Sequence, residues 1–160
     1  MQDMLTFIGQ QLGGTLDWEY LESVREEWDG PVALKGILSV IEAERAVSMG
    51  YDGIMVSNHG GRQFDGSPAA ISVLPGISSA VGDRAVILFD SGVRGGLDIA
   101  RALALGADFV MLGRAFMYGL SALGRKGGDH VARILVEDLK NNMTQLGCRT
   151  LAELPSRVQK

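Results

Sequence analysis

Four apolar segments, separated by stretches with helical periodicity, are the feature that most constrains the fold of this chain. Each segment is continuously apolar rather than alternating, as expected for strands buried on both faces of a parallel sheet. Helical stretches between successive strands predict right-handed crossovers and therefore parallel strand order. The predicted strands span residues 31–35, 53–57, 85–90 and 108–113.

Helix signals between and after these strands support the alternation. Ser39 and Glu42 form a capping-box pattern at a helix start. Residues 68–81 are predicted to be helical but interrupted at Pro75, because proline lacks the N–H that continues a helix. The remaining predicted helices span residues 17–28, 97–105 and 129–146, with a last capping pattern at residues 150–153.

Polar residues gather at the carboxyl ends of the predicted strands, which lie on one side of a parallel sheet. Active sites of (β/α)8 barrels are built on that side. An open, doubly wound sheet also binds its ligands there, so the pattern alone leaves both architectures open. The polar strand ends are Lys35 and residues 57–62, 90–94 and 113–114.

His59 and Arg62 follow the second predicted strand and suggest chemistry on a small acid. An imidazole can take a proton near neutral pH, and a guanidinium can hold a carboxylate with two parallel hydrogen bonds. The alternative for His59 is a histidine with a purely structural role. Protonation of His59 would disable the base, so activity should fall as the pH drops below the pKa of this histidine. A flat pH–rate profile from about pH 5 to 8 would contradict the role.

Glycine-rich turns after the last two predicted strands suggest an anion site. Gly92 and Gly113 allow backbone N–H groups to approach an anion, and helix starts add a favourable dipole. Taken alone, each turn is better explained by tight chain reversal, but the occurrence of both on consecutive strand ends favours an anion site. Both turns carry an arginine, Arg94 and Arg114, and the loops after the last two strands are the usual phosphate site of a barrel.

Lys35 ends the first predicted strand, where burial without a partner would be costly. One interpretation is a side chain that extends from the strand to solvent. The other is a fixed positive charge that faces an electron-rich cofactor.

Composition excludes several classes of protein. The net charge is −4 and the basic residues are scattered over 160 positions, which argues against nucleic-acid binding. No His or carboxylate pair has metal-ligand spacing, and Cys148, the one cysteine, is expected to serve packing. Neither a membrane-spanning run nor a secretory signal at residues 1–4 is evident, so the cytoplasm is the expected location.

Taken together, these motifs resemble the FMN-dependent α-hydroxy acid dehydrogenases and oxidases, the family of L-lactate dehydrogenase, mandelate dehydrogenase and glycolate oxidase. The resemblance covers about residues 31–154 and is carried by SNHGGRQ at 57–63, DSGVR at 90–94, and the Lys35 and Arg114 motifs. It implies that His59 is the catalytic base and that Arg62 and His59 bind the substrate. The implied FMN-binding residues are Lys35, Ser57, Asp90, Ser91, Gly92, Arg94, Gly113 and Arg114.

The resemblance further implies an α/β fold of the (β/α)8 barrel type, of which this chain holds the second half. Residues 1–30 would then be a linker and helix, 31–127 four strand–helix units, and 128–160 C-terminal helices of one partial domain. The implied reaction oxidises an L-2-hydroxy acid, with L-lactate the expected substrate, to a 2-oxo acid. The implied partners are the missing N-terminal half or a second copy, and peripheral attachment to the inner membrane is compatible with the family.

Two alternatives stay open at this point. The chain could be a non-catalytic half-barrel that binds only FMN or phosphate. It could also come from another FMN barrel, such as type 2 isopentenyl diphosphate isomerase. Arg62 favours the hydroxy acid family, because a carboxylate anchor is superfluous for a diphosphate substrate.

Overall fold

The computed structural model describes Thr6 and residues 16–159, and the contacts divide the chain into two units between Gly30 and Pro31. In the first unit, helix α2 (Trp18–Glu27) begins where Oδ1 of Asp17 accepts a hydrogen bond from the backbone N–H of Tyr20 at 2.9 Å. This confirms the helix predicted at 17–28. The prediction about a secretory signal at residues 1–4 lies outside the described residues.

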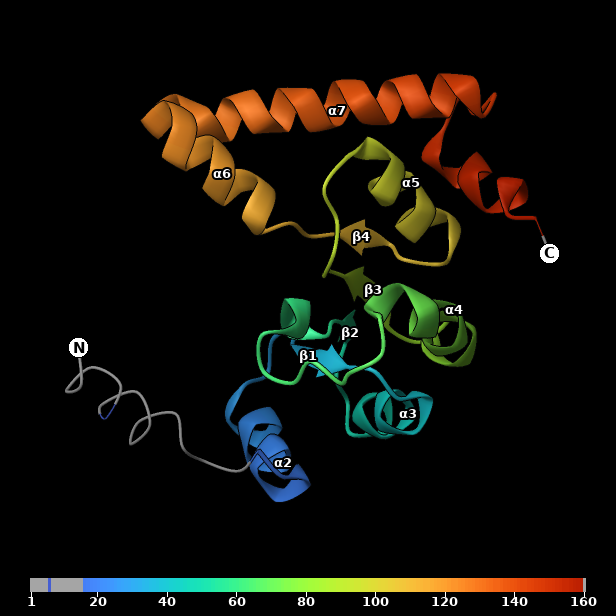
Figure 1. The fold of residues 1–160 in the computed structure, drawn as a ribbon. Helices are drawn as coiled ribbons and strands as arrows, with labels where there is room; N and C mark the ends of the chain where they lie inside the picture. Colours follow the sequence, from blue (N-terminus) through green and yellow to red (C-terminus); the bar gives the residue numbers. More distant parts are fainter. Residues whose placement is uncertain (1–5, 7–15, 160) are drawn as a thin grey trace. The chain divides into compact units, whose positions relative to one another are not determined.

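The second unit is built on a four-stranded parallel sheet in the order β1-β2-β3-β4 (Figure 1). Consecutive strands are neighbours, as in a sheet assembled from successive strand–helix units. The predicted α/β class and the parallel order are therefore confirmed. The strands are β1 (Ala33–Ile37), β2 (Gly53–Val56), β3 (Val86–Phe89) and β4 (Phe109–Val110).

β2 and β3 end within one residue of the predicted ranges, whereas β1 and β4 differ by more. β1 extends to Ile37 because the pairing with β2 shifts between Lys35 and Ile37, and Gly36 takes up the shift with φ of 95°. Only glycine adopts that conformation readily. β4 is shorter than the apolar run predicted, although the backbone N–H of Met111 still donates to the Phe89 carbonyl at 2.8 Å.

Helices follow each strand, with two differences in detail. Ser39 precedes α3, but its side chain makes no capping hydrogen bond, so the predicted capping box is wrong. α4 runs continuously through Pro75, because a proline there removes a single backbone bond from a helix that is held by buried contacts. The helices are α3 (Val40–Ser48), α4 (Ala70–Val81), α5 (Gly96–Ala104), α6 (Arg114–Leu123) and α7 (Gly127–Gln145), with 3-10 turns η1 (His59–Gly61), η2 (Gly124–Lys126) and η3 (Leu151–Arg157).

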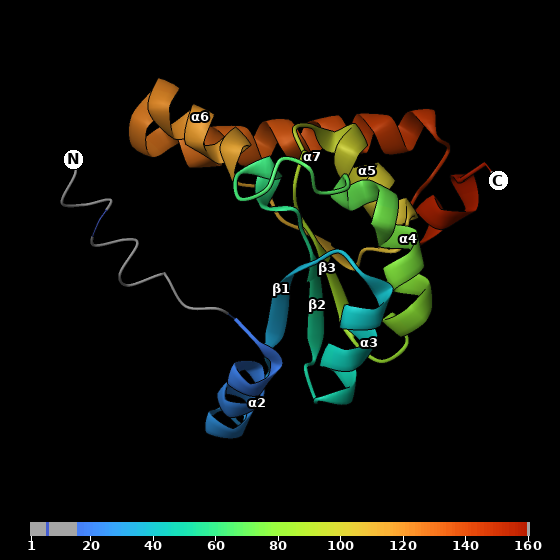
Figure 2. The same ribbon diagram turned by 60° about the horizontal axis from the view of Figure 1, so that its bottom comes forward.

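The two faces of the sheet differ in burial. Helices α3 and α4 pack on one side of β2 and β3 (Figure 2). On these strands Ile54, Ile87 and Phe89 are almost fully buried, with Phe89 2% exposed. Val86 and Phe109 belong to the other face and are 51% and 61% exposed. Strand residues alternate between faces, so within the second unit one apolar face of the sheet is left partly exposed.

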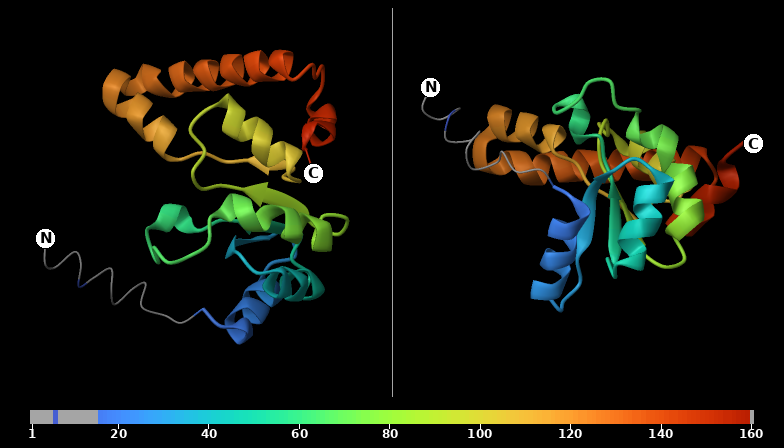
Figure 3. Two further views of the ribbon diagram at one scale, coloured as in Figure 1. Left: turned by 45° about the vertical axis from the view of Figure 1, so that its right-hand side comes forward. Right: turned by 90° about the horizontal axis from the view of Figure 1, so that it is seen from below.

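The C-terminal helices form a layer beside α5 (Figure 3). α6 and α7 approach so closely at Gly119 and Gly127 that a Cβ atom on Gly127 would lie 2.0 Å from the Gly119 carbonyl oxygen. Cys148 is buried with Ala100 and Leu154, in agreement with its predicted packing role. Among the described residues, no helix combines the length and apolar character needed to cross a membrane.

Candidate active site

The carboxyl ends of the strands border an open cleft of about 240 Å³. Five functional side chains from four different strand ends meet there: His59, Arg62, Lys35, Arg94 and Arg114. The spatial convergence predicted from the strand-end rule is therefore found. The lining also includes Gly60, Asp90, Ser91, Gly92, Val93, Met111, Leu112, Gly113 and Met117.

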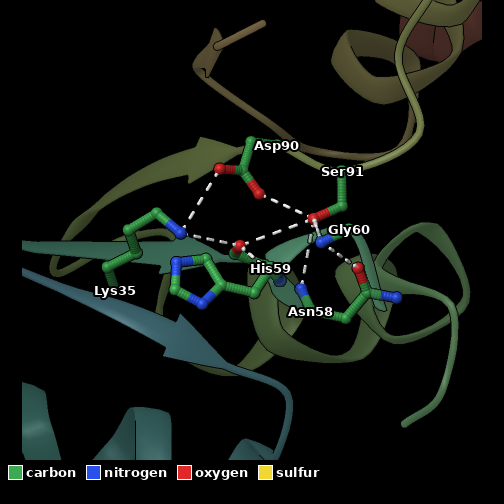
Figure 4. A network of polar contacts seen from close by, with 7 residues as sticks. Lys35, Asn58, His59, Gly60, Asp90 and Ser91 are labelled. Carbon is green, nitrogen blue, oxygen red and sulfur yellow. Dashed lines mark hydrogen bonds and ion pairs between the residues drawn. The ribbon is translucent and has the colours of Figure 1, made fainter. Parts of the chain in front are cut away.

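Lys35 is held in place by two polar partners at the base of the cleft. Its Nζ donates to Oγ of Ser57 at 3.0 Å and lies 3.4 Å from Oδ2 of Asp90 (Figure 4). Ser57 is buried, whereas Lys35 and Asp90 keep partial access to solvent, which screens their attraction. The lysine is thus a partnered, oriented charge, and its ammonium borders the cleft.

The loop that carries His59 is fixed by its backbone N–H groups. The N–H of His59 donates to Oγ of Ser57 at 3.1 Å, and that of Gly60 donates to Oδ1 of Asn58 at 3.0 Å. His59, Gly60 and Gly61 have φ values of 57°, 68° and 73°. Three successive left-handed residues explain why two glycines follow the histidine.

The functional ends of His59 and Arg62 are available to a ligand. Both residues are exposed and line the cleft. Among the described residues, neither the imidazole nor the Arg62 guanidinium makes a hydrogen bond or ion pair within the chain. Within the same described part, no group of three or more His, Cys, Asp or Glu side chains is arranged to hold a metal ion.

Ser91 connects the His59 loop to the lysine pair. Its Oγ lies 2.7 Å from Oδ1 of Asp90, and it accepts from the backbone N–H groups of Asn58 at 3.2 Å and Gly60 at 3.3 Å. The network in Figure 4 therefore runs from Lys35 through Asp90 and Ser91 to the loop. The hydroxyl of Ser91 is hydrogen-bonded within the protein, and Ser91 also lines the cleft.

The two glycine turns lie open to the cleft. A Cβ atom added to Gly92 or Gly113 would meet nothing within 4 Å, so a ligand can approach either backbone. Arg114 reaches across to the His59 loop, where a Cβ atom on Gly60 would lie 2.8 Å from its Nη2. Arg94 also borders the cleft, and its Nη1 donates to the Val93 carbonyl at 2.9 Å.

The start of α5 differs from the predicted anion site. Oδ2 of Asp138, from α7, accepts a short hydrogen bond from the N–H of Gly96, and Oδ2 of Asp98 accepts from the N–H of Arg94 at 3.0 Å. Carboxylates of this chain therefore occupy donors that an external anion would need at this helix start. The start of α6, at Gly113, carries no side-chain cap, so this helix start and the Gly92 turn are the glycine positions whose backbone stays open to a ligand.

Sequence reasoning assigned no role to Asn58, which supports the His59 loop, or to two methionines that line the cleft. Asn58 supplies the cap of the His59 loop, and its position directly before the histidine was an available signal, since asparagine commonly caps such turns. Met111 and Met117 line the cleft wall. Both were hidden by their apolar character, because an apolar strand end or helix face is normally taken as core.

Comparison with known proteins places these features in context. The FMN-dependent dehydrogenase family matches residues 1–160. An L-lactate dehydrogenase from Chromohalobacter salexigens is 45% identical over 156 residues, which cover 98% of this chain and 40% of that protein. An FMN-dependent alpha-hydroxy acid dehydrogenase from Schizosaccharomyces pombe is 56% identical over 124 residues, covering 78% of this chain and 30% of that protein.

Solved structures give the same result for the fold. The crystal structure of mandelate oxidase with (S)-4-hydroxymandelic acid superposes with a TM-score of 0.84 at 42% identity, covering 88% of this chain and 40% of that chain. The chain therefore spans about 40% of the length of both the Chromohalobacter L-lactate dehydrogenase and this mandelate oxidase.

Proposed function

This chain belongs to the FMN-dependent dehydrogenase family, and we propose that it forms the part of an L-2-hydroxy acid dehydrogenase that carries the base and the FMN phosphate site. The observation that carries the proposal is the single cleft shared by His59, Arg62 and Arg114. A base, a carboxylate anchor and an anion site are what such a reaction requires.

The cleft fits the phosphate end of FMN. The Gly92 and Gly113 turns leave room for an anion against the backbone, and Arg94 and Arg114 add positive charge beside them. Lys35 would face the flavin ring with its oriented ammonium, and Ser57, Asp90 and Ser91 would support that edge. When bound, FMN supplies the capacity to accept two electrons from the substrate.

The chain's own residues account for binding and proton transfer. Arg62 would hold the substrate carboxylate with paired hydrogen bonds, which fixes the α-carbon relative to the cleft. The unpartnered imidazole of His59 would then accept a proton from the bound hydroxy acid. L-Lactate is the proposed substrate because the Chromohalobacter salexigens protein, 45% identical to 98% of this chain, is an L-lactate dehydrogenase.

The open apolar face suggests what completes the site. Val86 and Phe109 are about half exposed on a sheet whose outer strands, β1 and β4, each lack a neighbour on one side among the described residues. Unpaired edges and exposed apolar faces favour further pairing. We propose that the remaining strands of a barrel cover this face, with self-association of the chain as the competing outcome in a size measurement.

The decisive experiment measures flavin absorbance and its response to substrate. The chain is tested alone and as a chimera, in which it replaces the matching 156 residues of the Chromohalobacter enzyme. Bound flavin that bleaches with L-lactate without oxygen is expected of the chimera. Arg62→Gln should keep the flavin absorbance but lose bleaching at low lactate. A chimera that binds flavin and never bleaches would favour the non-catalytic alternative.

A further inference from the structure

Ser91 holds a backbone conformation that normally favours glycine. Its φ is 84°, and among the described residues His59 is the other non-glycine residue with positive φ. Such a conformation costs a residue with a Cβ atom free energy that glycine avoids. The hydroxyl group is the part of Ser91 that can offset this cost.

Hydrogen-bond accounting shows how fully the hydroxyl is used. A serine hydroxyl donates one hydrogen bond and accepts two. The Ser91 hydroxyl donates to Oδ1 of Asp90 at 2.7 Å. Its two lone pairs remain for the N–H groups of Asn58 and Gly60. The contact with Oγ of Ser57, at 3.4 Å, is the weakest of the set.

These bonds hold the backbone on both sides of His59. The N–H groups of Asn58 and Gly60 bind Ser91, and the N–H of His59 itself binds Ser57. Three consecutive N–H groups therefore point at two hydroxyls. The carboxylate of Asp90, behind Ser91, strengthens this arrangement because hydrogen bonds in a chain polarise one another.

We propose that Ser91 is a positioning residue that fixes the loop under His59 and ties it to the Asp90–Lys35 pair. The inference rests on the proposed function, in which His59 is the base and Lys35 faces the flavin. Asp90 gives Oδ2 to Lys35 and Oδ1 to Ser91, so one carboxylate orients both the cation and the loop. Without the hydroxyl, the loop would lose two of its backbone anchors.

Two substitutions separate the hydroxyl from the backbone conformation. Ser91→Gly removes the hydroxyl and relieves the strained φ, so it should fold at least as readily as the parent chain. Ser91→Ala removes the hydroxyl and keeps the strain. Ser48→Ala is the control, since the Ser48 hydroxyl donates only to the Glu44 carbonyl within α3. Hydrogen exchange of the full chain should quicken about tenfold or more at the amide of Asn58 in both Ser91 variants, and not in the control. The change at Gly60 should be smaller, because its N–H keeps the hydrogen bond to Oδ1 of Asn58.

Activity supplies the second readout. In the chimera, Ser91→Gly should lower kcat about 10- to 100-fold, because a small misplacement of a catalytic group has effects of that size. Because Ser91 also lines the proposed FMN site, kcat is compared at saturating FMN, so that weaker flavin binding does not enter this readout. Unchanged exchange at Asn58, or a Ser91→Gly chimera with the parent kcat, would overturn the inference. If the parent chimera is inactive, the proposed function fails, while exchange still decides whether Ser91 holds the loop.

Discussion

Gly60 offers a test of the phosphate site, because Arg114 packs against it. An alanine Cβ at Gly60 would lie 2.8 Å from Nη2 of Arg114, closer than real Cβ contacts allow. The guanidinium is the end of a flexible side chain and should move away. Gly61 is the matched control, since it has a similar φ, 73° against 68°, and its Cβ would meet only Oδ1 of Asp65 at 3.4 Å.

The two substitutions should cost similar stability but different affinity. A non-glycine residue in the left-handed region costs about 1–2 kcal/mol, and this term applies at both positions. Displacement of Arg114 applies to Gly60→Ala alone. Hydrogen bonds to a charged group contribute about 1.5–3 kcal/mol, so the dissociation constant for FMN should rise about 10- to 100-fold. Gly61→Ala should leave it nearly unchanged.

Flavin fluorescence quenching measures the affinity, and urea unfolding measures the stability. A double-mutant cycle with Arg114→Gln isolates the cause: in that background, Gly60→Ala should have little further effect on FMN binding. Equal loss of affinity in Gly60→Ala and Gly61→Ala would show that loop strain, and not Arg114, determines binding. An undiminished Gly60→Ala affinity would refute the placement of the phosphate beside Arg114.

Two further predictions concern stability. The pKa of Glu153 is lowered mainly by the hydrogen bond from the backbone N–H of Arg149, then by the Thr150 hydroxyl and the charge of Arg157. The contribution of Glu153 to the free energy of unfolding is present above its unfolded-state pKa and is lost as pH falls through its folded-state pKa. Glu153→Gln should therefore lower the urea midpoint near neutral pH but not in acid. Equal effects at both pH values would contradict this. Phe89→Ala should cost about 3–5 kcal/mol, because Phe89 is fully packed against the helices. Phe109→Ala, on the open face, should cost less than about 1 kcal/mol in urea unfolding of the isolated chain, and equal costs would mean that the two faces are wrongly assigned.

The sheet was predictable because burial on both faces leaves a continuous apolar run, as in Gly53–Val56. Strand ends were harder, since the extension of β1 depends on a shift at Gly36 that composition does not reveal. Pro75 misled for a physical reason. Proline inside a helix is disfavoured because it removes a backbone hydrogen bond. Leu74 and Ile77, on either side of Pro75, are fully buried, and their packing outweighs that loss.

The cleft was predictable to the extent that parallel strand ends must meet. His59 and Arg62 follow β2, whereas Arg114 follows β4, and topology alone brings these two strand ends together. The role of Asp138 was not predictable in this way. It binds Gly96, 42 positions earlier in the chain, only because α7 packs on α5. Contacts between helix surfaces carry no local sequence signal comparable to a strand end.

The charges around the cleft match the charges of the proposed ligands. Among the described residues that line it, Lys35 has a carboxylate within ion-pair distance, whereas Arg62, Arg94 and Arg114 have none. A phosphate monoester carries nearly two negative charges near neutral pH, and a substrate carboxylate adds one. Three unpaired guanidinium groups therefore face about three negative charges. Lys35, already partly neutralised by Asp90, is suited instead to charge that develops only during the reaction, which is the role that the flavin edge requires.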